Sequence, residues 1–97
     1  MRVPKPFPGS SLTTRAFWAR FNTLPKADQL QARDAHRLWL SDPRMPGLRY
    51  KKVHADRPIY SVRVNIKIRA VGILTGNDIV WFWIGPHDEY ESLLKGL

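Results

Sequence analysis

The stretch that decides the fold is residues 59–84, which read IYSVRVNIKIRAVGILTGNDIVWFWI. Apolar and polar residues alternate over 60–65, which is typical of a strand with one dry and one wet face. The same alternation over 66–71 predicts a second strand, and Gly76-Asn77 is a favourable hairpin turn. Residues 79–84 are apolar at every position, which predicts a strand buried on both faces. The stretch therefore predicts an antiparallel sheet.

The residues before this stretch have a helical period instead. Apolar residues recur at three- and four-residue steps over 12–24, which predicts an amphipathic helix ended by Pro25. A second helix is expected over 26–40, ended by Ser41-Asp42-Pro43, because the residue before a proline is pushed out of helical geometry. The short connection predicts an antiparallel helical hairpin. The candidate N-caps of the first helix are Ser10, Ser11 and Thr13.

The remaining segments complete the prediction. A shorter strand is expected over 49–54, and Gly85-Pro86 should open a C-terminal helix with proline at its first position. Residues 1–9 hold three prolines and one glycine, which predicts an extended N-terminal arm. We therefore predict one α+β domain over residues 1–97. It has an N-terminal helical hairpin packed on one face of a twisted, mainly antiparallel sheet of about four strands, and a short C-terminal helix.

Length and composition exclude several classes of protein. Ninety-seven residues suit a single core, and 43% hydrophobic content with four Trp and four Phe excludes a wholly disordered chain. The absence of Cys excludes a disulfide framework, a thiolate zinc site and a thiol nucleophile, and it favours the reducing cytoplasm. The sequence has no run of 18 apolar residues, so no membrane span is predicted. No paired carboxylates have metal-ligand spacing, so we expect no metal and no cofactor.

Charge is the first indication of function. Sixteen Lys and Arg against eight Asp and Glu give a net charge of +8. Residues 44–69 contribute +7 of this charge, since Asp56 is their only acid. Such segregation favours a face that binds a polyanion over a uniformly solvated surface. The basic residues of this segment are Arg44, Arg49, Lys51, Lys52, Arg57, Arg63, Lys67 and Arg69.

Taken in order, several segments resemble the RelE/ParE superfamily of toxins from bacterial type II toxin–antitoxin systems. The resemblance covers residues 12–95, and the family fold agrees with the α+β prediction. The segments that carry it are 59–64, 68–72, 81–85 and 87–94. Earlier features fit the same group, namely Phe17 and Phe21 before Leu24-Pro25, Trp39 before Asp42-Pro43, Pro46-Gly47-Leu48, and Lys51-Lys52.

The resemblance implies a choice between two activities. RelE-like members cut mRNA in the ribosomal A site, whereas ParE-like members poison DNA gyrase. Both are silenced by a cognate antitoxin, and the pair usually binds its own operator DNA. We expect a ribosome-dependent mRNA endonuclease with mRNA, the ribosome and an antitoxin as partners, and with operator DNA reached through the antitoxin. The alternatives are a gyrase inhibitor and a non-toxic nucleic-acid-binding module.

Metal-independent RNA cleavage needs groups that deprotonate the ribose 2′-hydroxyl, stabilise the phosphate and protonate the leaving 5′-oxygen. The resemblance implies that Arg63 and Arg69 clamp the scissile phosphate, because arginine does not give up its proton. His87 takes the place of a family arginine, and an imidazole can act as acid or base near neutral pH. Tyr90 would stack on a base or share in proton transfer. Ser61 stands where RelE has a lysine.

Further basic residues are expected to contact RNA phosphates, and several candidates also have a purely structural interpretation. The expected phosphate contacts are Arg49, Lys51, Lys52 and Lys67. The Lys51-Lys52 pair would equally suit a solvated edge strand that discourages aggregation. His87 would equally suit a helix cap or the surface, and Tyr90 would equally suit packing against the sheet. His36, within the second helix, is expected to be structural.

Overall fold

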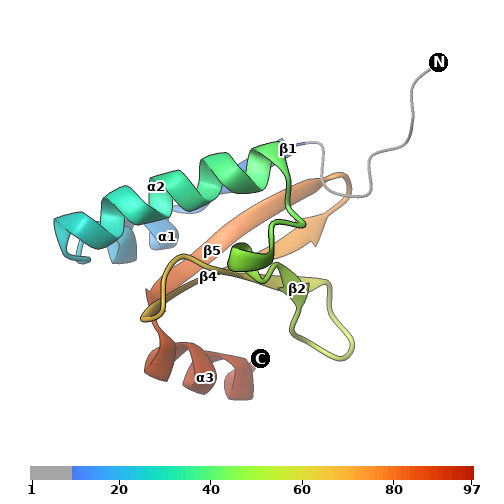
Figure 1. Cartoon of the computed structure of the whole chain (residues 1–97). Coiled ribbons are helices and arrows are strands. Elements are labelled where there is room, and N and C mark those ends of the chain that lie inside the picture. Colours follow the sequence, from blue (N-terminus) through green and yellow to red (C-terminus); the bar gives the residue numbers. More distant parts are fainter. Residues whose placement is uncertain (1–9) are drawn as a thin grey trace.

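The computed structural model describes residues 10–97, so the arm predicted over residues 1–9 lies outside the described part of the chain. The α+β class predicted from the sequence is confirmed (Figure 1). The elements in chain order are β1 (Ser10–Thr13), α1 (Arg15–Phe21), α2 (Lys26–Ser41), the 3₁₀ turn η1 (Pro46–Leu48), β2 (Lys51–Lys52), β3 (Ile59–Arg63), β4 (Ile68–Thr75), β5 (Asp78–Pro86) and α3 (His87–Gly96).

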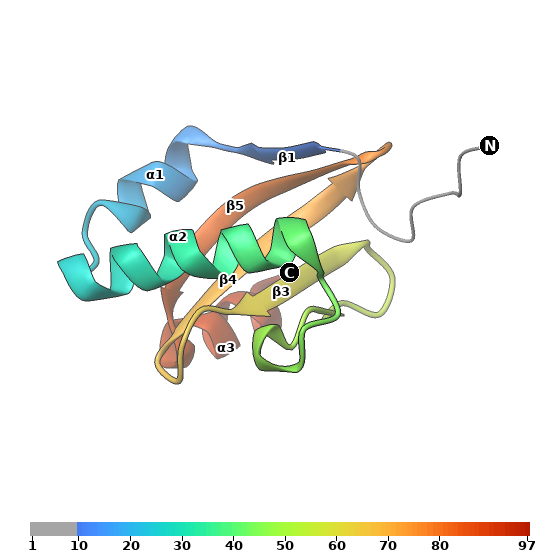
Figure 2. The same ribbon diagram turned by 45° about the horizontal axis from the view of Figure 1, so that its top comes forward.

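The sheet has five strands rather than about four, in the order β1-β5-β4-β3-β2. The strand that the sequence did not predict is β1, which pairs in parallel with β5, while the other pairs are antiparallel. Figure 2 shows β1 running beside β5. Residues 10–13 are strand rather than helix start because they supply backbone partners to the outer edge of β5. The helix N-cap is consequently Thr14, whose hydroxyl accepts a hydrogen bond from Phe17 N at 3.1 Å.

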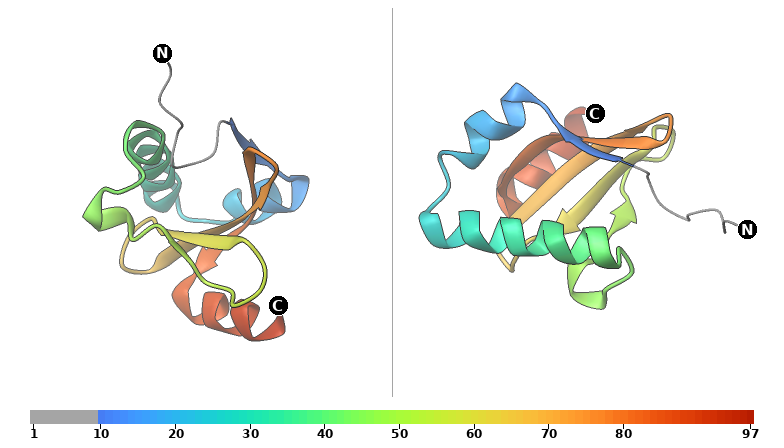
Figure 3. Two further views of the ribbon diagram at one scale, coloured as in Figure 1. Left: turned by 90° about the vertical axis from the view of Figure 1, so that its right-hand side faces the viewer. Right: turned by 90° about the horizontal axis from the view of Figure 1, so that it is seen from above.

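Helices cover both faces of the sheet. In Figures 1 and 3, α1 and α2 lie over one face and α3 lies under the other. The α1–α2 side holds the larger core, made of Phe17, Phe21, Ala35, Trp39, Leu48, Val62, Ile68, Ala70, Ile79, Trp81 and Ile84. The α3 side holds a smaller one, made of Ile59, Val71, Trp83 and Tyr90. The two-faced burial predicted for residues 79–84 is therefore confirmed within β5.

The two N-terminal helices do not pack tightly against each other as the predicted hairpin would. A cavity of about 420 Å³ lies between them, above the sheet. The reason is that their large side chains point toward the sheet instead. Phe17 and Phe21 of α1 join the core over β5, and the Trp39 ring of α2 meets Trp81 edge-on with the centroids 5.5 Å apart. Each helix is thus anchored to the sheet rather than to its neighbour.

Three predicted strand and helix limits are also wrong by a few residues. The strand expected over 49–54 is reduced to Lys51–Lys52, because η1 and its left-handed C-cap Arg49 (φ 47°) end just before it. Ile66, expected in a strand, is 74% exposed in the turn between β3 and β4. Pro86 is the N-cap of α3 rather than its first helical residue. The Gly76-Asn77 turn is confirmed, and Gly76 has the positive φ of 63° that glycine permits.

A bulge sets which aromatic residues of β5 face which helix. Val71 pairs with Trp83 and the next residue, Gly72, pairs with Trp81, so Phe82 has no partner of its own. Gly72 has to be glycine because a Cβ there would lie 2.8 Å from Trp81 Cε3 and 3.0 Å from Ile79 Cγ1. Phe82 and Trp83 both pack on the α3 side, and Trp81 packs on the other.

Replacing Gly72 by alanine should destabilise the fold by about 1–3 kcal/mol, because the methyl group overpacks the space that the Trp81 ring fills. For a domain of this size each kcal/mol lowers the melting temperature by roughly 4–8 °C. The matched control is Gly47→Ala, since a Cβ at Gly47 meets no atom within 4 Å. Thermal unfolding followed by circular dichroism compares the two, and equal melting temperatures would contradict this account of the bulge.

Candidate functional site

Two of the predicted phosphate-clamping residues stand directly opposite each other. Arg63, the last residue of β3, pairs with Arg69 of β4 in the antiparallel ladder. Residues two positions apart in a strand share a face, and the residues two positions from these arginines are Ser61 and Val71. Ser61 bonds to Tyr90 of α3 and Val71 packs in the core on the α3 side, so the arginines belong to the sheet face opposite α1 and α2. The alternation over 60–65 and 66–71 puts both arginines at polar positions of their strands, and the strand pairing then brings them together.

The charge of a third arginine, Arg49, also acts on Arg69. Burial lowers the pKa of Arg69, the charge of Arg63 lowers it further, Tyr90 acts in the opposite direction, and Arg49 again lowers it. The charges of Arg63 and Arg49 thus both act on Arg69, and we call Arg49, Arg63 and Arg69 the arginine cluster. Like charges of this kind are unfavourable together unless an anion neutralises them.

No carboxylate of residues 10–97 forms an ion pair with the arginine cluster. The ion pairs found there join Arg20 with Glu89, Arg37 with Asp34, and His87 with Glu91. Arginine remains protonated in proteins, so the cluster cannot relieve its repulsion by losing a proton. It is therefore a fixed, uncompensated positive site, and an anionic partner is the group that would neutralise it.

The turn between β3 and β4 orients one of these guanidinium groups. Arg69 Nη1 donates to the backbone oxygens of Asn65 and Ile68, at 2.7 and 3.1 Å. The Asn65 side chain holds the turn, since its Oδ1 accepts hydrogen bonds from Lys67 N and Ile68 N and its Nδ2 donates to Asp28 Oδ1 of α2 at 2.9 Å. Sequence reasoning missed Asn65. The available signal was an Asn at the junction of two predicted strands, where Asn side chains commonly form turns.

His87 is the first residue of α3 and lies at the edge of the site. Its backbone N donates to the Lys67 oxygen at 2.7 Å, which ties the start of α3 to the turn between β3 and β4. Its side chain is 41% exposed, and Nδ1 lies 3.5 Å from Glu91 Oε1. The ring centroids of His87 and Tyr90 are 5.7 Å apart. The imidazole is thus accessible to solvent and is held on a helix that also contacts the arginine side of the sheet.

Tyr90 is buried, with 7% of its surface exposed. Its hydroxyl donates to Ser61 Oγ at 3.1 Å, and Ser61 is itself buried. This contact joins α3 to β3, which is the packing role that the sequence offered beside the chemical one. Ser61, at the position where RelE has a lysine, serves as its acceptor.

The predicted lysines are spread over three places. Lys51 pairs with Ser61 and so belongs to the face of the arginine cluster, while Lys52 pairs with Tyr60 and belongs to the opposite face. Both are on the edge strand of the sheet, the position that the structural interpretation requires. Lys67 lies in the turn between β3 and β4 and borders a separate cavity of about 560 Å³, together with Arg20 and Glu89.

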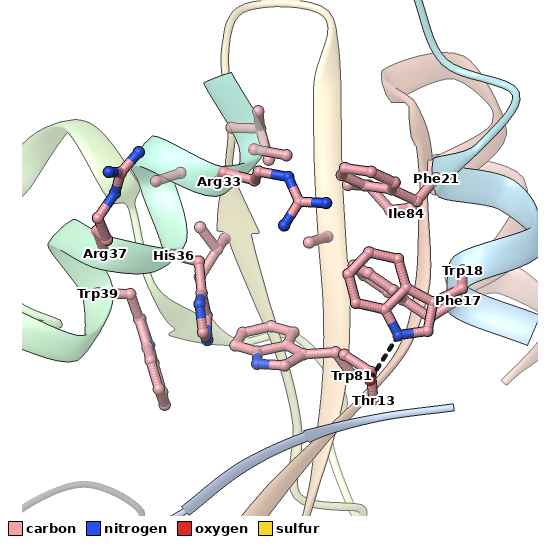
Figure 4. A pocket seen from close by; sticks show the side chains of 15 residues that line it. Thr13, Phe17, Trp18, Phe21, Arg33, His36, Arg37, Trp39, Trp81 and Ile84 are labelled. Atoms are coloured by element: carbon pink, nitrogen blue, oxygen red, sulfur yellow. Dashed lines mark hydrogen bonds between the residues drawn. The ribbon is translucent and has the colours of Figure 1, made fainter. Parts of the chain in front are cut away.

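The cavity between α1 and α2 is the second surface feature (Figure 4). Aromatic rings dominate its walls, and Trp18 Nε1 donates to Thr13 Oγ1 at 2.8 Å. The guanidinium carbon of Arg33 lies 5.2 Å from the Phe21 ring centroid and 5.8 Å from that of Trp18, within cation–π range. Arg37, which is ion-paired with Asp34, also lines the cavity, whereas no Asp or Glu of residues 10–97 does. It is therefore an apolar groove with a positive rim.

The other two histidines have structural contacts. His36 Nε2 is 2.9 Å from Ser11 Oγ, its ring stacks on Trp39, and burial lowers its pKa. His54 Nδ1 accepts hydrogen bonds from the backbone nitrogens of Asp56 and Arg57, which shapes the loop between β2 and β3. These contacts agree with the structural role expected for His36.

Two further properties concern the described part of the chain alone. Residues 10–97 contain no group of three or more His, Cys, Asp or Glu side chains placed to hold a metal ion. No helix within those residues is both long enough and apolar enough to cross a membrane.

Comparison with known families identifies the domain. Residues 26–92 match the model of the ParE-like toxin domain. The chain belongs to this toxin family. The resemblance to the RelE/ParE superfamily noted in the sequence is thereby confirmed. A comparison of this ParE-like toxin with curated proteins finds no significant sequence match.

Solved structures share the toxin fold at low sequence identity. YafQ from E. coli strain BL21(DE3) superposes with a TM-score of 0.68 at 10% identity, covering 82% of this chain and 94% of that one. RelE in the RelB–RelE complex of Methanococcus jannaschii gives 0.64 at 12% identity, covering 84% and 96%. The YoeB/ParE toxin from Agrobacterium tumefaciens gives 0.63 at 15% identity, covering 80% and 98%. At these identities the likeness establishes the fold alone.

The Tyr90–Ser61 contact predicts a non-additive pair of substitutions. Tyr90→Phe leaves the buried Ser61 hydroxyl without its donor and should cost about 1–3 kcal/mol of unfolding free energy. Adding Ser61→Ala removes the orphaned group as well, so the double variant should be more stable than Tyr90→Phe alone. Urea unfolding of the wild type and three variants measures the coupling. Strictly additive losses would show that the two hydroxyls do not interact.

Proposed function

We propose that this ParE-like toxin is a ribosome-dependent mRNA endonuclease that blocks translation. The observation that carries the proposal is the arginine cluster, which has no carboxylate partner within residues 10–97 and whose Arg63 and Arg69 belong to the sheet face that α3 contacts. The scissile phosphate of RNA is an anion suited to neutralise it. His87 opens α3 as a half-exposed imidazole, so a group that can move protons accompanies the cationic surface.

In the proposed reaction the ribose 2′-oxygen attacks the adjacent phosphorus. The new bond is 2′-O–P and the broken bond is P–5′-O, so the products are a 2′,3′-cyclic phosphate and a 5′-hydroxyl. One proton leaves the 2′-hydroxyl and one reaches the 5′-oxygen. Arg63 and Arg69 would stabilise the negative charge that builds on the phosphate, and His87 would carry one of the two proton transfers.

The ribosome is part of the proposal because the site offers few catalytic groups. The hydroxyl of Tyr90 is engaged by Ser61, which leaves the imidazole of His87 as the group best suited to proton transfer near neutral pH. Such a site depends on a substrate already held in line for attack, and positioning alone can contribute roughly 7–11 kcal/mol to catalysis. We propose that the mRNA bound on the ribosome supplies this geometry in the cytoplasm.

A cognate antitoxin is the proposed regulatory partner, and operator DNA would be reached through it. Support comes from similar structures that are complexes of a RelE toxin with RelB, from Pyrococcus horikoshii and Methanococcus jannaschii. The apolar groove between α1 and α2 offers a docking surface, and Arg33 at its rim suits an acidic segment. Arg49, Lys51, Lys52 and Lys67 remain the proposed contacts to RNA phosphates.

DNA gyrase inhibition is the second candidate. The name of the matched family model, ParE-like toxin domain, favours it. The two candidates differ in what the arginine cluster would contact, which is RNA in one and gyrase in the other. They also differ at His87, because gyrase inhibition requires no proton transfer.

A translation extract separates the two candidates. The wild-type protein should cut mRNA engaged on ribosomes and spare the same RNA when it is naked. His87→Gln should lower the single-turnover rate by roughly 10²–10⁴-fold with little change in binding, as expected for the loss of a general acid or base. Intact mRNA together with gyrase-linked DNA breaks would select gyrase inhibition instead. Cleavage by His87→Gln at the wild-type rate would remove His87 from the proton transfer.

Expression of the protein without an antitoxin should arrest bacterial growth. Arg63→Ala should relieve the arrest, because one of the opposed guanidinium groups is lost while no hydrogen bond of Arg63 to residues 10–97 is broken. Arg69→Ala should relieve it too, although this variant also frees the turn oxygens of Asn65 and Ile68. Arg37→Ala, an exposed change on α2, is the control that should keep the arrest. Undisturbed growth at high levels of folded wild-type protein would rule out a toxin.

A further inference from the structure

The outer edge of β5 is left open where β1 ends. The parallel ladder stops at Thr13 and Trp81, and the last contact of this kind is Thr14 N to Trp81 O at 3.1 Å. Beyond Trp81, β5 continues through five more residues to Pro86 and then turns directly into α3. This open end of β5 is where the chain leaves the sheet to place His87.

A side chain from α1 covers that open edge of β5. Arg20, in the last turn of α1, donates from Nε to the Ile84 backbone oxygen at 2.8 Å. Its guanidinium carbon lies 4.7 Å from the ring centroid of Trp83, which packs on the α3 side. Arg20 therefore reaches past the end of β5, from the layer of α1 and α2 toward the layer of α3.

The same guanidinium holds the first turn of α3. Arg20 Nη2 donates to Glu89 Oε1 at 3.0 Å, and Glu89 is the third residue of the helix. The N-cap, Pro86, makes no side-chain capping hydrogen bond, so this turn depends on contacts from elsewhere. Among residues 10–97 these contacts are Arg20 to Glu89, the Lys67 oxygen to His87 N, and Ser61 to Tyr90.

Space around Arg20 is closely fitted. A Cβ on Gly85 would lie 2.9 Å from Arg20 Nη2 and 3.0 Å from Trp83 Cη2. The residue of β5 just before the N-cap is thus a glycine because the guanidinium and the indole occupy the place of a side chain. Trp83 in turn contacts Tyr90, with centroids 6.5 Å apart, and Tyr90 contacts His87. Both routes from Arg20, through Glu89 and through Trp83, lead to the turn that carries the imidazole.

We propose that Arg20 is a positioning residue, which fixes the first turn of α3 and thereby the His87 imidazole relative to the arginine cluster. Its planar fork suits this task because Nε and Nη2 point to two acceptors at once, one on β5 and one on α3. A lysine carries the same charge but cannot hold both acceptors in a fixed geometry. The expected effect of Arg20 on the cleavage rate rests on the proposed endonuclease function. Its expected effect on the position of His87 does not, because that is measured in the free protein.

The test compares Arg20→Gln, Arg20→Lys and Glu89→Gln with the control Arg15→Gln, an exposed change on the same helix. The first readout is the imidazole NMR spectrum of the free protein over a pH titration. Arg20→Gln and Arg20→Lys should both shift the ring resonances of His87, while those of His36 and His54 stay in place. Arg15→Gln should leave all three unchanged. His36 and His54 serve as internal references because neither contacts Arg20 or Glu89.

The second readout is single-turnover cleavage of ribosome-engaged mRNA. Arg20→Gln should lower the rate at saturation by ~10–100-fold with binding unchanged, as expected when a catalytic group is displaced by about an ångström. Arg20→Lys should show the same loss, and Glu89→Gln a smaller one because the Ile84 contact remains. Should Arg20→Gln fail to fold, Glu89→Gln carries both measurements.

Two results would overturn the proposal. One is an unmoved His87 ring in Arg20→Gln and Arg20→Lys, whatever happens to the rate. The other is full activity in Arg20→Lys, which would assign the effect to charge rather than to the fork. A wild-type protein that cuts no RNA would refute the endonuclease, and the NMR comparison alone would then decide whether Arg20 positions His87.

Discussion

Strand β5 is the constraint on which the rest of the structure depends. It pairs with β1 on one side and β4 on the other. Its apolar side chains pack both in the core under α1 and α2 and in the core under α3. The bulge at Val71 and Gly72 gives Trp81 to one layer and Trp83 to the other. Because both faces and most of both edges are covered, β5 fixes where α1 and α3 can sit. The turn that carries His87 is its direct continuation.

The site illustrates the opposition between stability and function. Arg63 and Arg69 share a sheet face, the charge of Arg49 also acts on Arg69, and none of the three has a carboxylate partner in the described chain. Burial separately disfavours the charged form of Arg69. A sequence selected for stability alone would place an acid among them. Features that break a local rule without a stabilising return tend to mark functional sites. Here the stabilising contacts lie around the arginines. The Asn65 backbone oxygen accepts a hydrogen bond from Arg69, and the Tyr90 hydroxyl donates to Ser61.

Much of the fold was predictable because it rests on period and on turn residues. The alternation in β3, the apolar run in β5 and the Gly76-Asn77 turn are local signals, and the alternation also puts Arg63 and Arg69 at polar positions of their strands. The failures involve long-range contacts. Nothing local marks Ser10–Thr13 as a strand, since its reason is the edge of β5. Arg20 is likewise unremarkable in the sequence, because both of its acceptors lie more than 60 positions away.

The pairing of β1 with β5 has a consequence for how the protein is made. It joins Ser10 to Asp78, and such distant pairings form slowly because a long loop must close first. In a chain that leaves the ribosome N-terminus first, the residues of β1, α1 and α2 are synthesised before those of β3, β4 and β5. The apolar sides of these helices have no sheet to cover during that time, and the arginines of β3 and β4 have no scaffold. The site to which we assign the activity therefore assembles only after the last third of the chain has been synthesised, because it needs β4, β5 and α3 together.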